Sequence, residues 1–237
     1  YHCLVTSAMR HITGRRQFSV PRMKATAGAT GSGRSRDREG TERAILEAAQ
    51  RLVAREGYAA FGVNAVAREA GCDKQLIYRY FGGTDGLIAA IGEAAAEWAE
   101  QALADVRAPP GAPYGKVVAA FLDALLDALR GDALMRQLIG WEMTGTGEAV
   151  HKMAAARSAA MTRRIIPLLR AAAPPPAGTD APAINALLIG AVQQSAMSGA
   201  ALGGFSGLPL ASAADWDRLK AALRAMVEAL YPERPQP

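Results

Sequence analysis

Four hydrogen-bonding side chains lie close together in the segment AGCDKQLIYRYFGG: Lys74, Gln75, Tyr78 and Arg79. On a helix, positions three and four residues apart share one face, so these side chains point to one side and the apolar ones to the other. Lysine and arginine neutralise phosphates, a tyrosine hydroxyl can donate to a phosphate oxygen, and glutamine can pair with an adenine edge. The segment therefore predicts a helix with one face for its own core and one for a nucleic acid.

Two further helices must position this segment. An amphipathic helix is expected to begin with Thr41 as its N-cap and to end at Gly57. A second, short helix follows from about Val63 and stops at Gly71. The residues GCD then turn the chain into the third helix, with Asp73 as its N-cap. A tight glycine-containing turn between two short helices is typical of a helix-turn-helix.

The residues from Thr41 to Leu87 resemble the DNA-binding domain of TetR-family transcriptional regulators. The resemblance rests on the ungapped segment TERAILEAAQRLVAREGYAAFGVNAVAREAGCDKQLIYRYFGGTDGL, including its Gly57–Tyr58 pair, the VAREAG motif, and Ile77–Tyr78 with Phe81. It implies that the DNA-facing residues of the third helix are Lys74, Gln75, Tyr78 and Tyr80. It also implies that Asn64, on the second helix, can reach a base. The charge of Arg79 adds it to the candidate DNA-binding residues.

This sequence departs from the family pattern at three positions. The family usually has Thr or Ser, a helix cap and phosphate contact, where this chain has Gly62; it often has Lys at Thr84 and usually His at Tyr80. Residues 41–86 hold six basic and six acidic groups, so this module is neutral. Residues 1–40 hold eight basic and two acidic groups, so phosphate attraction is expected to depend partly on them.

The fold class expected is all-α, because no strand pattern occurs and apolar residues recur at helical spacing. An N-terminal three-helix helix-turn-helix domain precedes a C-terminal helical domain for ligand binding and dimerisation. We expect a disordered basic leader over residues 1–40, the helix-turn-helix domain over 41–86 and the helical domain over 87–237. Further helices are expected at about 87–106, 117–131, 132–143, 147–171, 183–202 and 215–231.

Bulky or polar groups occur in the helices that would surround a central cavity. The candidate ligand-binding residues are Trp98, Met135, Trp141, Glu142, Gln193, Gln194 and Met197. Ordinary core packing is the alternative for each of them. The last two helices carry apolar rows that a monomer would leave partly exposed, which predicts a homodimer through Leu187, Leu188, Ala191, Val192, Leu219, Leu223, Met226 and Leu230.

Other functional classes find little support in the sequence. Cys3 and Cys72 are the only cysteines, which argues against a disulfide framework and favours the cytoplasm. His151 is the only histidine outside the leader, so no metal site, cofactor or partnered nucleophile is expected. The most apolar stretch, residues 184–202, contains two adjacent glutamines, which argues against a membrane helix.

These features predict a ligand-responsive homodimeric regulator that represses transcription and leaves a palindromic DNA operator when a small hydrophobic ligand binds. Two alternatives stay open. A protein-binding coregulator with weak DNA affinity is favoured by Gly62 and Thr84. A helical enzyme with a vestigial helix-turn-helix would need a catalytic pair, a phosphate loop or a metal motif, and the sequence shows none.

Overall fold

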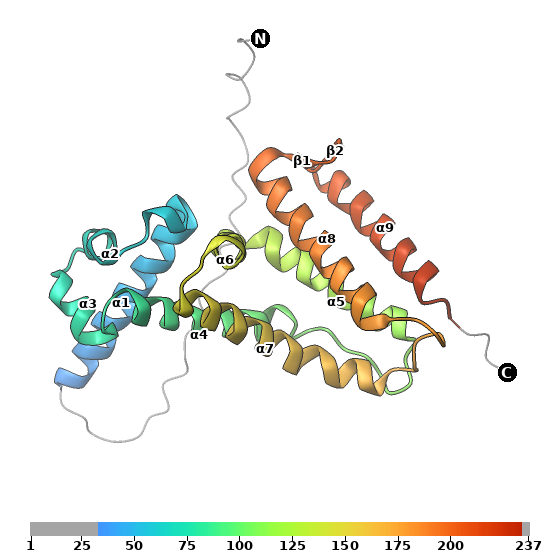
Figure 1. The fold of residues 1–237 in the computed structure, drawn as a ribbon, viewed down its shortest axis with the longest axis horizontal. Helices are drawn as coiled ribbons and strands as arrows, with labels where there is room; N and C mark the ends of the chain where they lie inside the picture. Colours follow the sequence, from blue (N-terminus) through green and yellow to red (C-terminus); the bar gives the residue numbers. More distant parts are fainter. Residues whose placement is uncertain (1–32, 234–237) are drawn as a thin grey trace, which may run out of the picture.

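The protein is almost entirely helical in the computed structural model, which describes residues 33–233, with side chains from residue 38 onward (Figure 1). The expected all-α fold is thus confirmed for this part of the chain. Its elements, in order, are α1 (Gly33–Glu56), a short 3-10 turn (Tyr58–Ala60), α2 (Val63–Ala70), α3 (Lys74–Phe81), α4 (Thr84–Ala102), α5 (Tyr114–Gly131), α6 (Ala133–Thr144), α7 (Glu148–Ala171), α8 (Ala181–Leu202), β1 (Gly204–Phe205), β2 (Leu208–Pro209) and α9 (Ala213–Leu230).

The helices form two ends joined by a middle layer. Helices α1, α2 and α3 lie together at one end, and α5, α8 and α9 at the other (Figure 1). Helices α4 and α7 run side by side between them, and both α8 and α9 pack on α5. Helix α6 contacts both α1 and α7, so it lies between the two ends.

Helix α1 begins earlier than the sequence indicated. It starts at Gly33, so residues 33–40, expected to be disordered, are helical, and Thr41 lies inside the helix rather than at its N-cap. Composition misled the expectation, because Arg and Glu are good helix formers even in a glycine-flanked segment. The rest of the expected leader lies outside the described residues.

A small β-hairpin joins α8 to α9, where no strand was expected. Strands β1 and β2 pair antiparallel, with Phe205 opposite Leu208. The two residues between them, Ser206 and Gly207, both have positive φ angles, of 48° and 81°. Two such residues make the tight turn whose twist matches paired strands. Strands of two residues carry no alternating pattern, so periodicity cannot reveal them.

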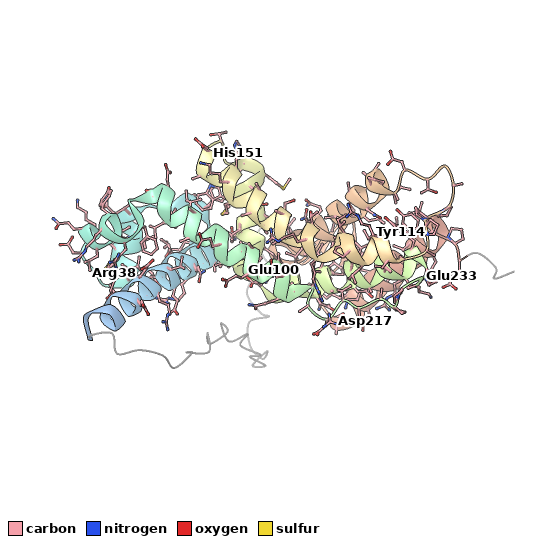
Figure 2. All side chains as sticks on the ribbon, turned by 90° about the horizontal axis from the view of Figure 1, so that it is seen from below. Arg38, Glu100, Tyr114, His151, Asp217 and Glu233 are labelled. Atoms are coloured by element: carbon pink, nitrogen blue, oxygen red, sulfur yellow. The ribbon has the colours of Figure 1, made fainter. Side chains whose placement is uncertain are left out.

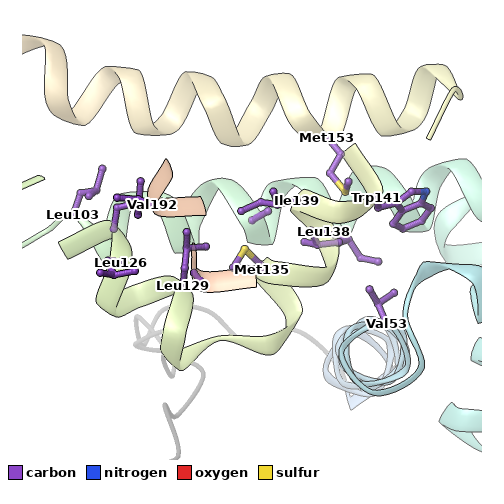
Figure 3. Packing of buried hydrophobic residues seen from close by; sticks show 14 of the residues in the cluster. Val53, Leu103, Leu126, Leu129, Met135, Leu138, Ile139, Trp141, Met153 and Val192 are labelled. Carbon is purple, nitrogen blue, oxygen red and sulfur yellow. The ribbon is translucent and has the colours of Figure 1, made fainter. Parts of the chain in front are cut away.

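One hydrophobic cluster runs through both ends of the molecule. Leu138 and Trp141 of α6 lie near Val53 of α1, and Met153 lies on the side of α6 that faces α7 (Figure 3). Helix α4 approaches α7 closely at Gly92, where an added Cβ would lie 3.1 Å from the Cα of Met153. The helix-turn-helix therefore shares a packed core with the helices that follow it.

Candidate nucleic-acid interface and the helices behind it

Helix α3 is held by its turn and by one buried side chain. Gly71 ends α2 in the left-handed conformation, with φ of 64°. The carboxylate of Asp73 then accepts a hydrogen bond of 2.8 Å from the backbone N–H of Gln75, which confirms the expected N-cap. Ile77 is fully buried in the core. These contacts fix the rotation of α3 about its axis.

The opposite face of α3 is open to solvent. Lys74, Gln75, Tyr78 and Arg79 are all exposed, and Tyr78 retains 57% of its surface. The ring of Tyr78 lies against Gly83, where an added Cβ would come within 3.3 Å of a ring carbon. The ring is therefore braced by the backbone after α3, while most of the side chain stays accessible.

The two remaining candidate residues differ in exposure. Asn64 is exposed in the first turn of α2. Tyr80 is half-buried and packs against the core cluster. The guanidinium carbons of Arg38 and Arg79 each lie 5.8 Å from the centre of the Tyr80 ring. Tyr80 thus presents its ring to two cations, one from α1 and one from its own helix.

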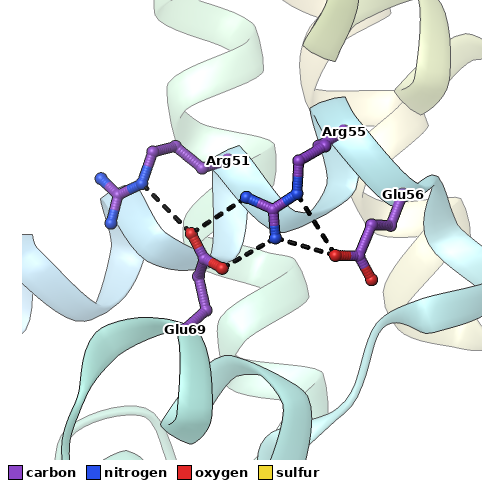
Figure 4. Close-up of polar contacts among 4 residues, drawn as sticks. All are labelled: Arg51, Arg55, Glu56 and Glu69. Atoms are coloured by element: carbon purple, nitrogen blue, oxygen red, sulfur yellow. Dashed lines mark hydrogen bonds and ion pairs between the residues drawn. The ribbon is translucent and has the colours of Figure 1, made fainter.

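An ion-pair network ties α1 to α2 and was not expected from the sequence (Figure 4). The Glu69 carboxylate accepts hydrogen bonds from Arg55 at 2.8 and 3.3 Å and from Arg51 at 3.5 Å, and Arg55 also pairs with Glu56. The hydrogen bonds from Arg55 lower the pKa of Glu69, and the Arg51 charge adds to this effect. The positive charges of two arginines of the module are therefore balanced by carboxylates of the same chain.

Helix α6 docks on the segment that joins α1 to α2. The indole of Trp141 stacks on Tyr58 and meets Phe61 edge-on, with centroids 5.8 and 5.2 Å away. The Thr144 hydroxyl donates a 2.9 Å hydrogen bond to the Tyr58 hydroxyl. Such aromatic pairs add to the free energy of area burial. The contact connects the helix-turn-helix directly to α6.

The other side of α6 is joined to α7 by a buried ion pair. The Arg157 guanidinium donates to both oxygens of Glu142, at 2.8 and 2.6 Å. Their side chains are only 8% and 9% exposed. A two-pronged geometry of this kind compensates both charges away from water. Glu142, a candidate ligand-binding residue, therefore already has a partner within the chain.

Comparison with known proteins identifies the family that the first three helices resemble. Residues 45–91 match the family model described as "Bacterial regulatory proteins, tetR family". The chain carries the helix-turn-helix module of the TetR family. A curated relative, the HTH-type transcriptional repressor SCO4008 of Streptomyces coelicolor, is 32% identical over 121 residues, which cover 50% of this chain. The matched region spans 58% of that relative's length.

Solved structures share the fold beyond the TetR-family module. The transcriptional regulator FadR from Bacillus subtilis, in complex with stearoyl-CoA, is similar with a TM-score of 0.58 and 15% identity, over 78% of this chain and 96% of its own. A TetR family transcription regulator from Marinobacter aquaeolei has a TM-score of 0.57 and 18% identity, over 85% of this chain and 100% of its own. At identities this low, the TM-scores establish a likeness of fold alone.

The seven candidate ligand-binding residues lie behind the TetR-family module in differing environments. Met135 and Trp141 are buried, whereas Trp98, Gln193 and Met197 are half-buried. Gln194 is exposed, and its amide donates a 2.8 Å hydrogen bond to Ser198. Two surface hollows, of about 410 and 560 Å³, are lined by other residues. The predicted cavity is therefore not one of these two hollows.

The apolar rows of α8 and α9, far from the TetR-family module, divide between two faces. Leu188, Val192 and Leu223 are buried within the chain. Leu187 and Met226 are 76% and 54% exposed, and Ala191 and Leu230 are also exposed, whereas Leu219 is half-buried. The two helices thus keep an apolar outer face after the chain has folded.

The described residues contain no group of three or more His, Cys, Asp or Glu side chains that could hold a metal ion. Across the same residues, every helix is too short or too polar to cross a membrane. Cys72 of the TetR-family module is half-buried, and burial raises the pKa of its thiol. A raised pKa leaves less of the reactive thiolate, in keeping with a packing role.

Proposed function

We propose that this chain is a homodimeric transcriptional regulator of the cytoplasm, a repressor that a small hydrophobic ligand releases from a palindromic operator. The observation that carries the proposal is the two-sided α3, which buries Ile77 and exposes Lys74, Gln75, Tyr78 and Arg79. The family of the module and the name of the Streptomyces relative, a transcriptional repressor, support it. The proposal assigns the chain no catalytic activity.

The contacts with DNA follow from the chemistry of the exposed face. A helix of this size fits the major groove, where Gln75 can hydrogen-bond to both polar groups of an adenine edge. Lys74 and Arg79 pair with phosphates, and the braced Tyr78 donates its hydroxyl to a phosphate oxygen. Asn64 reaches a base from the first turn of α2. Phosphate contacts set the register, and the two amides read the sequence.

Dimerisation would cover the apolar outer face of α8 and α9. Leu187, Ala191, Met226 and Leu230 are exposed on these helices, and burying them against a second copy is favourable. Two α8–α9 pairs related by a two-fold axis would form a four-helix bundle. The same axis would present α3 twice, so the operator would be an inverted repeat. In this division residues 41–86 bind DNA, and residues 87–237 bind ligand and the second copy.

Ligand control would act through α6. This helix touches the module through Trp141 and α7 through the Glu142–Arg157 pair. A ligand that binds more tightly to one placement of α6 would change the spacing of the two α3 helices, and so the affinity for DNA. A hydrophobic ligand is supported by the similar fold of FadR, which is solved with stearoyl-CoA.

The direct test is DNA selection by the full-length chain. Incubated with a randomised duplex pool, it should enrich an inverted repeat, and light scattering should show a dimer on that duplex and free in solution. Tyr78→Phe should weaken binding to all duplexes about equally. Enrichment of no sequence would reject the operator, and would favour the protein-binding coregulator. A stable monomer at micromolar concentration would reject the dimer.

A further inference from the structure

The early start of α1 brings Arg38 to the recognition helix. Arg38 precedes the buried Ile45 by seven residues, which is close to two helical turns, so it continues the core-facing side of α1. Its guanidinium carbon lies 5.8 Å from the centre of the Tyr80 ring. Figure 2 labels Arg38 near the beginning of α1, at the same end of the molecule as α2 and α3. Helix α1 therefore extends the module at the α3 side.

Tyr80 supports this arginine with its ring. A cation over an aromatic face is attracted to the ring electrons while its N–H groups stay available at the edges. Arg38 is exposed, whereas Tyr80 is half-buried against the core. Arg79, on the exposed side of α3, lies at the same 5.8 Å from this ring. Two cations from different helices thus converge beside the face that we assign to DNA.

We propose that Arg38 contacts a backbone phosphate next to the recognition helix, and that Tyr80 is a positioning residue that holds Arg38 rather than a reader of DNA. The inference rests on the proposed DNA-binding function and extends its contact surface to the first turns of α1. A planar guanidinium suits a phosphate because it offers two parallel N–H donors. Such a contact adds affinity for every sequence and leaves the choice of operator to Gln75 and Asn64.

The first experiment compares two arginines of the same helix. Arg43 is also exposed on α1, but it lies five residues after Arg38 and therefore on the opposite face. Binding of Arg38→Gln and Arg43→Gln is measured over a salt series, on a duplex selected by the wild-type full-length chain. Each lost phosphate contact makes the plot of log affinity against log salt shallower by about one. We expect this change for Arg38→Gln only.

The second experiment separates the ring of Tyr80 from its hydroxyl. Tyr80→Phe keeps the ring, so it should bind with the wild-type salt slope. Tyr80→Leu removes the ring and should reproduce the slope of Arg38→Gln, and the double variant Arg38→Gln/Tyr80→Leu should add no further change. Additive slopes, or weakened binding by Tyr80→Phe, would show that Tyr80 contacts DNA itself and would overturn its positioning role.

The failures of the two proposals are distinguishable. If the wild type binds a selected duplex and Arg38→Gln keeps the full salt slope, the phosphate contact is wrong and the operator model stands. Lower thermal stability of Arg38→Gln with an unchanged slope would assign Arg38 to the packing of α1 on α3 alone, which also overturns the inference. A wild type that enriches no duplex would overturn the proposed function and the inference together.

Discussion

The ring of Trp141 on α6 lies nearly parallel to that of Tyr58, just after α1, with 12° between the two planes. The two residues are 83 positions apart in the sequence, and their stack joins the DNA-binding module to the helices behind it. Phe61 makes an edge contact with the indole, and Thr144 donates a hydrogen bond to the Tyr58 hydroxyl. The orientation of the module therefore depends on a side chain of α6.

Replacing Trp141 with alanine should be costly. The indole is buried, so Trp141→Ala should lower the free energy of unfolding by about 3–5 kcal/mol. In a double-mutant cycle with Tyr58→Ala, measured by urea denaturation, the two changes should couple by about 0.5–1.5 kcal/mol. Additive effects would mean that the two rings stabilise the fold only through the area that each of them buries, with no further contribution from their stacking. Trp98→Ala is the control, because this half-buried tryptophan does not stack on Tyr58.

Removing one partner of the buried ion pair should destabilise the fold more than removing both. Arg157→Met leaves the Glu142 carboxylate buried without compensation, and should cost about 3–5 kcal/mol. Glu142→Leu/Arg157→Met removes both charges and should recover most of that loss in chemical denaturation. A double variant that is less stable than Arg157→Met would show that the pair stabilises the protein beyond the cost of desolvation.

Gly62 can be improved as a helix cap, whereas Gly71 cannot be replaced without strain. Gly62 is the N-cap of α2, has an extended φ of 172°, and has open space where a Cβ would lie. Gly62→Ser should therefore raise the free energy of unfolding by about 0.5–1 kcal/mol, through a new cap and a less flexible unfolded chain.

The matched control is Gly71→Ser, which also has open space but a φ of 64°. It should lower stability by about 1 kcal/mol, because a side chain is unfavourable in the left-handed region. If the two substitutions changed the thermal stability equally, backbone conformation would not decide whether a serine stabilises or destabilises the fold. Gly62→Ser also restores a hydroxyl that the TetR resemblance assigns to a phosphate, so DNA affinity should rise.

Gln75 should control operator sequence. Gln75→Ala removes the proposed base contact, so discrimination at one position of each half-site should relax by about 1–3 kcal/mol. The measurement is a binding selection on a randomised half-site, with Tyr78→Phe as the control that changes affinity but not preference. An unchanged preference in Gln75→Ala would move sequence reading to Asn64, to Lys74 or to the shape of DNA.

The Tyr231 hydroxyl should make stability fall in alkali. It donates to Asn185 at 2.9 Å, and burial raises its pKa to about 12, with smaller contributions from Tyr114 and Asp180. An unfolded tyrosine loses its proton near its ordinary pKa of about 10. The stabilisation is therefore complete below that pH and is lost as the pH rises toward 12.

The test is urea denaturation of Tyr231→Phe and the wild type across this range. The variant should be less stable near neutral pH, because Asn185 loses a donor, and its stability should depend less on pH. Parallel pH profiles would show that other groups cause the alkaline loss. Tyr58→Phe serves as the control, because it removes a tyrosine hydroxyl elsewhere in the fold.

Local rules were sufficient for the helix-turn-helix. The bounds of α2 and α3 and the Asp73 cap follow from residues within a few positions of each other. The start of α1 could not be read from composition, because arginine-rich segments occur both in helices and outside them. The β-hairpin was too short for a pattern.

The contacts behind the module depend on tertiary packing. Glu142 and Trp141 were selected from the sequence as ligand-binding candidates, but no local pattern shows that Arg157 and Tyr58 lie beside them. The same holds for Leu187 and Leu188, which are neighbours in sequence but differ fully in exposure. Helical spacing gives the faces of a helix, and the packing of the chain decides which face each neighbour covers.

The Arg51–Glu69–Arg55 network bears on how the protein would search a chromosome. A regulator finds its operator among a vast excess of competing sites, and every uncompensated cation lengthens its stay on the wrong ones. Glu69 and Glu56 together balance the charges of the two exposed arginines, so these arginines add little to the attraction for unrelated DNA. The neutral charge of this module would then favour binding to the operator over binding to unrelated DNA. Fewer protein molecules would be held at random positions, so fewer copies of the protein per cell would be needed to occupy the operator.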